Sequence, residues 1–286
     1  MCSYKKILIA IDGSEASYQA LLEGIKFAKD TKAEVFAVSV VPPHRELMSA
    51  FSIFGHIKDL ITKPYVKALE EAKDVAEEEG IEIKTFLEDG VPYEKIIEVA
   101  TQQNCDLIIT GRRGLTSFDK ILIGSTTAKL VSHSPIDLLI VPRNTRINFK
   151  KILAATDLSK HGNGAVKKAA RLAKNYDGEL SIISVIQLPP ELIVGEVEVM
   201  NLLKNEVEKG LKDLVEEIEK LGISPRVYIE KGDPHNVIVN VIKEQGYKLL
   251  AIGADKETAH KLIGSVAQKI IADSPIPVLV VKKFPE

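Results

Sequence analysis

Residues 6–12 read Lys6-Ile7-Leu8-Ile9-Ala10-Ile11-Asp12, and residues 151–157 repeat this run as Lys151-Ile152-Leu153-Ala154-Ala155-Thr156-Asp157. In both places a short apolar run leads to an aspartate. Further along, Ser134-Pro135-Ile136 returns as Ser274-Pro275-Ile276. Self-similarity at a nearly constant spacing is the mark of a repeated structural unit. The sequence therefore predicts two tandem copies of one domain.

Each copy alternates apolar runs with amphipathic stretches. The amphipathic stretches repeat apolar residues at helical spacing, as Leu21, Ile25 and Ala28 do, which gives one apolar stripe per helix. The apolar runs are nearly continuous in Ile, Leu and Val, as expected for parallel strands buried on both faces. In the first copy these runs cover residues 7–11, 35–41, 81–87, 107–110 and 138–141. The pattern predicts an α/β fold in which each copy has a five-stranded parallel sheet with helices on both faces.

The length of 286 residues suits two such units of about 140 residues each. A polar stretch at residues 143–148 joins the copies, so we expect a first domain at residues 1–146 and a second at 147–286. The segment at residues 42–64 has no equally clean counterpart in the second copy. Its apolar residues Met48, Phe51, Ile53 and Phe54 suit a flap or a partner surface.

Composition and charge exclude several classes of protein. With 38 basic and 40 acidic residues the net charge is −2, so no overall field favours nucleic acid as the main partner. No apolar run approaches the roughly 20 residues of a membrane span, and the start of the chain lacks a secretory signal. Cys2 and Cys105 form no metal or disulfide motif, as in proteins of a reducing compartment. We expect a cytoplasmic protein without membrane, nucleic acid or resident metal.

Two glycine-containing turns frame the candidate site. Gly111-Arg112-Arg113-Gly114 follows the fourth strand, and after nine residues Gly124-Ser125-Thr126 opens the next helical stretch. Glycines at the end of a parallel strand bring backbone N–H groups close to a phosphate. The start of a helix also attracts an anion, because its first N–H groups are unpaired and its dipole is positive there. The two turns predict one phosphate-binding crevice.

This spacing of glycines resembles the nucleotide signature of the universal stress protein family. The same resemblance extends to Asp12, to the Asp89-Gly90 turn and to the Ser134-Pro135 step, and it covers essentially the whole chain twice. It implies a Rossmann-like sandwich of the adenine-nucleotide alpha hydrolase-like type in each copy. It also implies ATP or AMP as the ligand, with Mg²⁺ accompanying ATP.

By position, the resemblance assigns roles to residues of the first copy. Asp12 and Val40 border the adenine and ribose, and backbone groups near Ala10 contribute to recognition of the base. The phosphates are surrounded by Gly111, Arg112, Arg113, Gly114, Gly124, Ser125 and Thr126. Other roles stay open for some of these residues. Asp12 could cap the following helix, the two arginines could be solvated charges, and Ser125 and Thr126 could act as helix caps while also contacting phosphate.

The second copy departs from the pattern. Its fourth strand is followed by Gly253-Ala254-Asp255-Lys256, so lysine replaces the second glycine, and only seven residues separate Lys256 from Gly264. The side chain of Lys256 would hinder a phosphate from approaching the backbone, and Asp255 adds negative charge beside any phosphate. The weaker candidates of a degenerate second site are Asp157, Gly253, Gly264 and Ser265.

Three classes of function are consistent with these patterns. The first is a nucleotide-responsive binding protein or switch in the stress response. The second is a slow ATPase or an autophosphorylating enzyme, and the third is a structural partner protein that needs no nucleotide. No P-loop, nucleophile elbow or catalytic residue is recognisable, so the first class is favoured and any ATP hydrolysis is expected to be weak.

Assembly follows from the sheet. The last strand of each copy is expected at a sheet edge, where unpaired backbone groups favour pairing. We therefore expect an internal pseudo-dimer within the chain, a homo-oligomer such as a dimer of whole chains, and a protein partner that the sequence leaves unknown.

Overall fold

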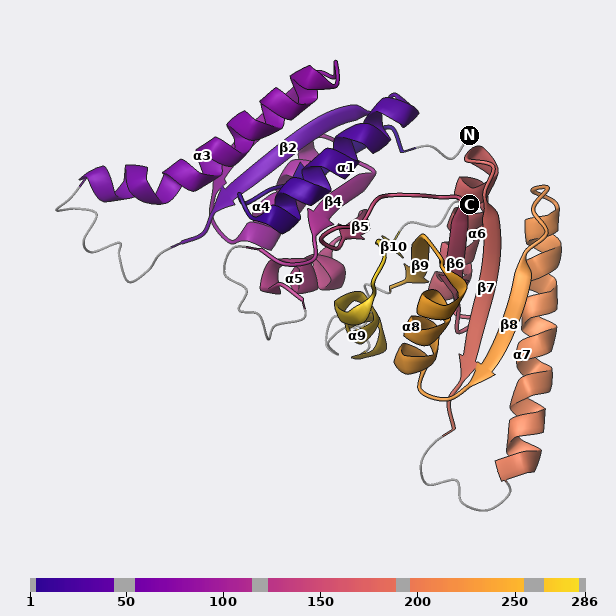
Figure 1. The fold of residues 1–286 in the computed structure, drawn as a ribbon. Coiled ribbons are helices and arrows are strands. Elements are labelled where there is room, and N and C mark those ends of the chain that lie inside the picture. Colours follow the sequence, from indigo (N-terminus) through magenta and orange to yellow (C-terminus); the bar gives the residue numbers. More distant parts are fainter. Residues whose placement is uncertain (1–3, 44–54, 115–122, 189–195, 255–264, 283–286) are drawn as a thin grey trace. The chain divides into compact units, whose positions relative to one another are not determined.

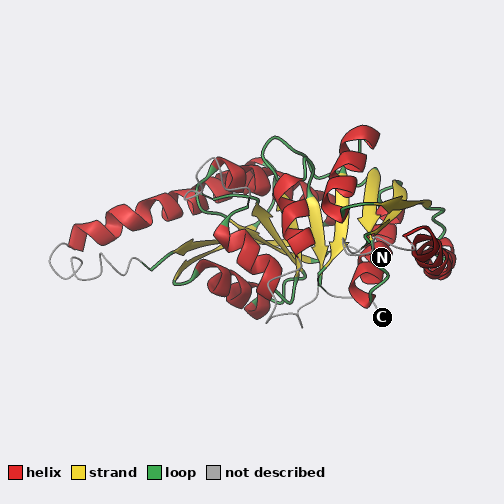
Figure 2. Cartoon of the chain, turned by 90° about the horizontal axis from the view of Figure 1, so that it is seen from below, coloured by secondary structure: helices red, strands yellow, loops and turns green. Residues whose placement is uncertain are grey.

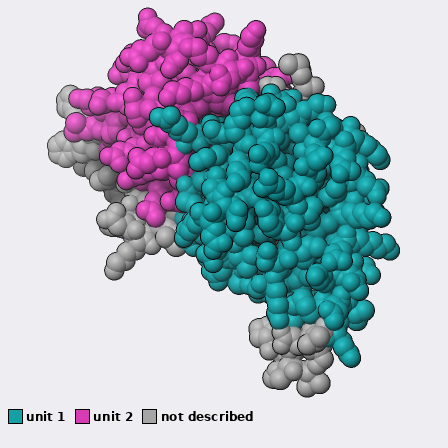
Figure 3. Space-filling model, turned by 45° about the vertical axis from the view of Figure 1, so that its right-hand side comes forward, with its two compact units in different colours: residues 1–3, 146–286 teal, residues 4–145 magenta. Residues whose placement is uncertain are grey.

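In a computed structural model, residues 4–43, 55–114, 123–188, 196–254 and 265–282 are described. The chain separates into two compact units, residues 4–145 and residues 146–286, which Figure 3 colours magenta and teal. We call them the first copy and the second copy. Within the described ranges, none of the helices is both long enough and apolar enough to cross a membrane.

The first copy is a parallel sheet covered by helices on both faces (Figures 1 and 2). The strand order is β3-β2-β1-β4-β5, and every pair is parallel. Helices α1 and α3 contact one another on one side of the sheet, and α4 and α5 do so on the other. The elements are β1 Lys6–Ala10, α1 Glu15–Thr31, β2 Glu34–Val41, α3 Gly55–Glu78, β3 Ile83–Asp89, α4 Pro92–Gln102, β4 Leu107–Gly111, α5 Ser125–His133 and β5 Asp137–Val141.

The second copy repeats this arrangement. Its strand order is β8-β7-β6-β9-β10, again with parallel pairs. Helices α6 and α7 pack together, as do α8 and α9. The predicted tandem α/β fold is confirmed. The elements are β6 Lys151–Ala155, α6 Lys160–Asn175, β7 Glu179–Ile186, α7 Glu196–Glu219, β8 Arg226–Lys231, α8 Pro234–Gln245, β9 Leu249–Gly253, α9 Ser265–Asp273 and β10 Val278–Val281.

Burial explains why four strands of the first copy were easy to predict and the third was misplaced. Every residue of β4 and β5 is buried, which matches their continuous apolar runs. β3 was expected at residues 81–87 but begins at Ile83. The N–H of Ile81 donates to the Ala76 carbonyl at 2.8 Å and so closes the end of α3. As an outer strand, β3 has no fully buried residue, and its apolar pattern is weaker.

The segment at residues 42–64 is only partly described. Residues 55–64 form the start of α3, a helix of 24 residues that contains Pro64. The apolar residues Met48, Phe51, Ile53 and Phe54 lie outside the described residues. In the second copy α7 also has 24 residues. The helix therefore has a counterpart that the sequence comparison did not reveal.

The first glycine of each glycine loop is a packing residue. A Cβ atom on Gly111 would lie 2.7 Å from the backbone of Ala16, at the start of α1. In the second copy, a Cβ on Gly253 would overlap the backbone of His161, at the start of α6. Both glycines let a helix approach the end of a strand closely. This contact explains why the first glycine is present in both copies although the second is not.

We expect Gly111→Ala and Gly253→Ala each to lower the free energy of unfolding by about 1–3 kcal/mol, because the helix backbone must move away. Urea unfolding followed by circular dichroism measures this change. Gly124→Ala is the control, since its Cβ would lie at an ordinary contact distance of 3.4 Å from the Arg112 carbonyl oxygen. That variant should lose less than about 1 kcal/mol. If Gly111→Ala were as stable as the wild type, the close approach would be wrong.

Candidate functional site in the first copy

A cavity of about 270 Å³ opens at the carboxyl ends of β1, β2 and β4. The strand order reverses direction between β1 and β4, and such a switch point is where open α/β sheets bind ligands. β1 ends at Ala10, which pairs with Val38, whereas β2 continues to Val41. The backbone of Val40 therefore lies beyond the last residue pair with β1 and borders the cavity.

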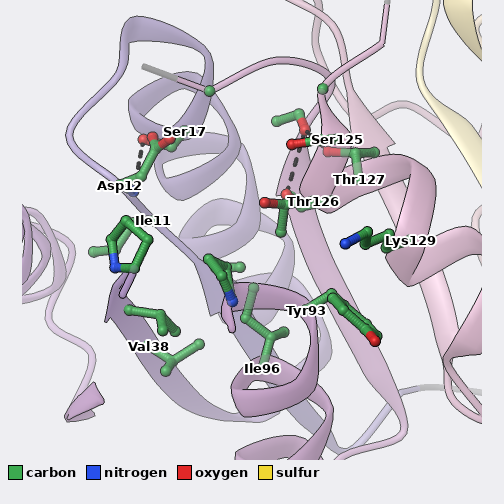
Figure 4. Close-up of a pocket in the computed structure, with 18 of the residues that line it drawn as sticks. Ile11, Asp12, Ser17, Val38, Tyr93, Ile96, Ser125, Thr126, Thr127 and Lys129 are labelled. Carbon is green, nitrogen blue, oxygen red and sulfur yellow. Dashed lines mark hydrogen bonds between the residues drawn. The ribbon is translucent and has the colours of Figure 1, made fainter. Parts of the chain in front are cut away.

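One end of the cavity is apolar. Figure 4 shows Ile11, Val38 and Ile96 at this end. Tyr65 from α3 and Tyr93 from α4 add aromatic rings to the lining. Burial, together with the charge of Asp12, raises the pKa of Tyr65 above its usual value. The apolar walls suit a flat, uncharged ring system.

The other end is built to receive an anion. Gly124 is the N-cap of α5 and has an extended backbone. Its N–H donates to the Arg112 carbonyl at 2.9 Å, and its own carbonyl accepts from Ala128 N–H at 2.9 Å. The N–H groups of the first helical turn, at Ser125 and Thr126, have no partner within the helix. Their position and the positive end of the helix dipole favour a phosphate.

Two threonines fix the start of the glycine loop. The hydroxyl of Thr127 donates to the Gly111 carbonyl at 3.0 Å, and the hydroxyl of Thr110 approaches the same oxygen at 3.3 Å. Both threonines are buried. Because Thr127 belongs to α5 and Gly111 ends β4, this bond ties the helix start to the strand end on which the loop is mounted.

The Asp12 side chain lies directly beside Gly114 of the glycine loop. Its Oδ1 accepts a hydrogen bond from Ser14 N–H at 3.1 Å. Ser14, and not Asp12, is the N-cap of α1, since its side chain accepts from Ser17 N–H at 3.2 Å. A Cβ atom on Gly114 would fall on Asp12 Oδ2. Glycine at position 114 therefore allows the carboxylate to approach the loop backbone closely.

Basic groups lie near the anion end. Arg113 and Lys129 both line the cavity, and Figure 4 shows Lys129 beside Tyr93. The Lys129 amine lies 5.0 Å from the centre of the Tyr93 ring, a cation–π distance. Lys129 is four residues after Ser125, so both lie on one face of α5.

The structure brings together most of the predicted site residues of the first copy. The cavity is lined by Ala10, Asp12, Val40, Gly111, Arg113, Gly114, Gly124, Ser125 and Thr126. Arg112 is not among the described lining residues. Its N–H donates to the Val141 carbonyl at 3.3 Å, and its carbonyl accepts from Gly124, so its backbone supports the loop.

Other lining residues were missed by sequence reasoning. Val38 lies two residues before Val40 and therefore on the same face of β2, a signal that could have found it. Thr127 and Lys129 follow Ser125 and Thr126 on the same helix. Tyr65 had no comparable signal, because it reaches the cavity from α3.

The second copy also has a cavity, of about 500 Å³, at the equivalent ends of its strands. Asp157 and Gly253 line it. Gly264 lies outside the described residues, as does the side chain of Ser265, the first residue of α9.

Comparisons with known proteins identify the class. The family model of the universal stress protein family matches residues 3–142 and again residues 148–282. The chain therefore belongs to the universal stress protein family, with two such domains in tandem.

Individual relatives agree with this assignment. The universal stress protein MJ0531 of Methanocaldococcus jannaschii is 35% identical over 141 residues, which cover 49% of this chain and 83% of that protein. YxiE, a universal stress protein of Bacillus subtilis, is 31% identical over 149 residues, covering 48% of this chain and 99% of its own. Among solved structures, a universal stress protein from Archaeoglobus fulgidus DSM 4304 aligns over 99% of both chains. Its TM-score is 0.74 and its sequence identity 25%.

Proposed function

We propose that the first copy binds ATP or AMP and that the chain acts as a nucleotide-responsive binding protein. The proposal rests on three features that line one cavity. An apolar slot, a carboxylate and the start of a helix face the same space, from Val38 through Asp12 to Ser125. An adenine nucleotide presents a matching sequence of groups, namely a flat base, a sugar with two hydroxyls and phosphates.

The base and sugar would occupy the end near β2. The adenine ring would contact Val38 and Ile96, and the backbone of Val40 beyond the last pair with β1 offers hydrogen-bonding groups to its edge. The carboxylate of Asp12 would accept hydrogen bonds from the ribose hydroxyls. A bond to a charged acceptor contributes more than a neutral one.

The phosphates would occupy the end near α5. Gly114 and Gly124 both line the cavity, and the first turn of α5 supplies N–H groups. Arg113 and Lys129 would balance the negative charge. Where Mg²⁺ accompanies ATP, the hydroxyls of Ser125 and Thr126 are the side chains suited to hold it.

The same geometry favours binding over turnover. Among the described lining residues the one carboxylate is Asp12, which would bind the ribose hydroxyls. Tight binding of unreacted ATP lowers its dissociation constant but does not accelerate its hydrolysis. Efficient phosphoryl transfer would need a group that positions water or removes a proton near the phosphates.

Nuclear magnetic resonance tests the location of the site. Addition of ATP is expected to shift the amide resonances of Val40, Gly114 and the first turn of α5. AMP should shift those of Val40 equally and those of the α5 turn less. Shifts that cluster away from these residues, or no shifts with either nucleotide, would refute the proposal.

Replacing Lys129 with alanine is expected to weaken ATP binding about 5- to 10-fold, because a charge-assisted contact to phosphate is lost. Adenosine, which has no phosphate, should bind unchanged. Titration calorimetry with ATP, AMP and adenosine measures the difference. Lys129→Arg should retain most of the affinity, and Lys269→Ala at the equivalent position of the second copy should have no effect. An equal loss for ATP and adenosine would mean that Lys129 acts only by packing on Tyr93.

A further inference from the structure

The second cavity preserves the end that would hold a base. Ile183, Val185 and Ile238 line it at the positions that Val38, Val40 and Ile96 occupy in the first copy. β6 ends at Ala155, paired with Ile183, and β7 continues to Ile186. As in the first copy, the carboxyl end of β7 extends past the end of β6 and borders the cavity at Val185.

The sugar end is preserved as well. Asp157 Oδ1 accepts a hydrogen bond from Ser159 N–H at 3.0 Å, which reproduces the contact between Asp12 and Ser14. Ser159 caps α6 by accepting from Gly162 N–H at 3.1 Å. Asp157 lines the cavity. The carboxylate is therefore mounted on the same turn in both copies.

The end that would hold phosphate is different. In the first turns of α9 the cavity is lined by Val266, Ala267 and Ile270. Val266 and Ala267 stand where the first copy has Thr126 and Thr127, so apolar groups replace both the Thr126 hydroxyl near the phosphate end and the Thr127 hydroxyl that holds the Gly111 carbonyl. Lys269, the counterpart of Lys129, is absent from the described lining.

These changes alter the preferred ligand. Phosphate oxygens placed against Val266 and Ala267 would lose water without gaining hydrogen bonds from these side chains, which is costly for a charged group. An uncharged ligand avoids that cost. His161 lines this cavity at the position of Ala16. The volume of about 500 Å³ lies within the roughly 300–1,000 Å³ of small-molecule sites.

We propose that the second copy binds an unphosphorylated purine nucleoside and discriminates against its phosphorylated forms. This inference rests on the proposed function, because the base and sugar ends are assigned by comparison with the first copy. The chain then carries a nucleotide site in one copy and a nucleoside site in the other.

Calorimetry on the full chain tests this inference with adenosine as the probe. Saturating ATP first occupies the first copy, so that adenosine added afterwards reports on the second. One further adenosine site per chain is expected, at which AMP binds at least about tenfold more weakly. Asp157→Asn should remove this event and leave ATP binding unchanged. AMP binding as tightly as adenosine, or no adenosine event in a chain that binds ATP, would overturn the inference.

A gain-of-function variant provides a second test. In the double variant, Val266→Thr restores the hydroxyl that Thr126 places near the phosphates, and Ala267→Thr restores the one with which Thr127 holds the strand end. AMP affinity at the second copy should rise several-fold while adenosine affinity stays the same. No gain for AMP in a variant with normal circular dichroism would contradict the assignment of the phosphate end. If adenosine binding depends on Asp157 but ATP binds nowhere, the proposed function fails and the nucleoside site stands.

Discussion

Replacing Gly114 with lysine is expected to weaken ATP binding by about 100-fold or more, since any side chain here collides with the groups around the ligand. The Cβ atom alone would fall on Asp12 Oδ2, so either the aspartate or the ligand must move. Lysine is also the residue at the equivalent position of the second copy, Lys256. Calorimetry measures the affinity, and urea unfolding should show a smaller loss of stability than Gly111→Ala causes, because the colliding atom is the end of a side chain and not helix backbone.

A second variant at position 114 distinguishes the effect of side-chain charge on ATP binding from the effect of side-chain size. Gly114→Val adds bulk without a positive charge and should also lose ATP binding. If both variants bound ATP normally, the phosphates would lie elsewhere. If only the lysine variant retained ATP binding, its positive charge would offset the collision, and bulk alone would not abolish binding.

Asp12→Asn is expected to weaken ATP binding about 10- to 100-fold, because two hydrogen bonds to a charged carboxylate contribute roughly 1.5–3 kcal/mol each and an amide replaces them poorly. A double-mutant cycle that combines Asp12→Asn with 2′,3′-dideoxy-ATP tests whether the carboxylate binds the ribose hydroxyls. The wild type should bind the dideoxy nucleotide much more weakly than ATP, and the variant should bind both alike.

The matched control is Asp157→Asn, which makes the same change on the same turn of the second copy. It should leave ATP binding unaltered. A loss that is equal for ATP and dideoxy-ATP in Asp12→Asn would place the carboxylate away from the ribose and assign it a role in shaping the loop.

Much of the fold was accessible from the sequence, for physical reasons that differ between elements. The inner strands were predicted because burial on both faces demands continuous apolar runs, as in Ile7–Ala10. β3 was misplaced because an outer strand needs apolar residues on one face only, and its preceding residues Ile81 and Glu82 look equally suitable. The end of α3 is decided by a backbone hydrogen bond of Ile81, which no side-chain pattern records.

The parts of the candidate site that are contiguous in sequence were predictable, and the parts that packing brings together were not. The glycine loops and the start of α5 are contiguous stretches with a recognisable spacing. Gly111 and Gly114 look alike in sequence, yet one makes room for the backbone of α1 and the other for the carboxylate of Asp12. Tyr65 reaches the cavity from α3, so only the folded chain reveals it.

We propose that this chain has one ATP site and that it lies in the first copy. Titration of the wild-type chain with ATP measures the number of sites directly. We expect about one ATP bound per chain, with binding abolished by Gly114→Lys and unchanged by Asp157→Asn. Two equivalent ATP sites, or the absence of binding with ATP, ADP and AMP alike, would contradict it.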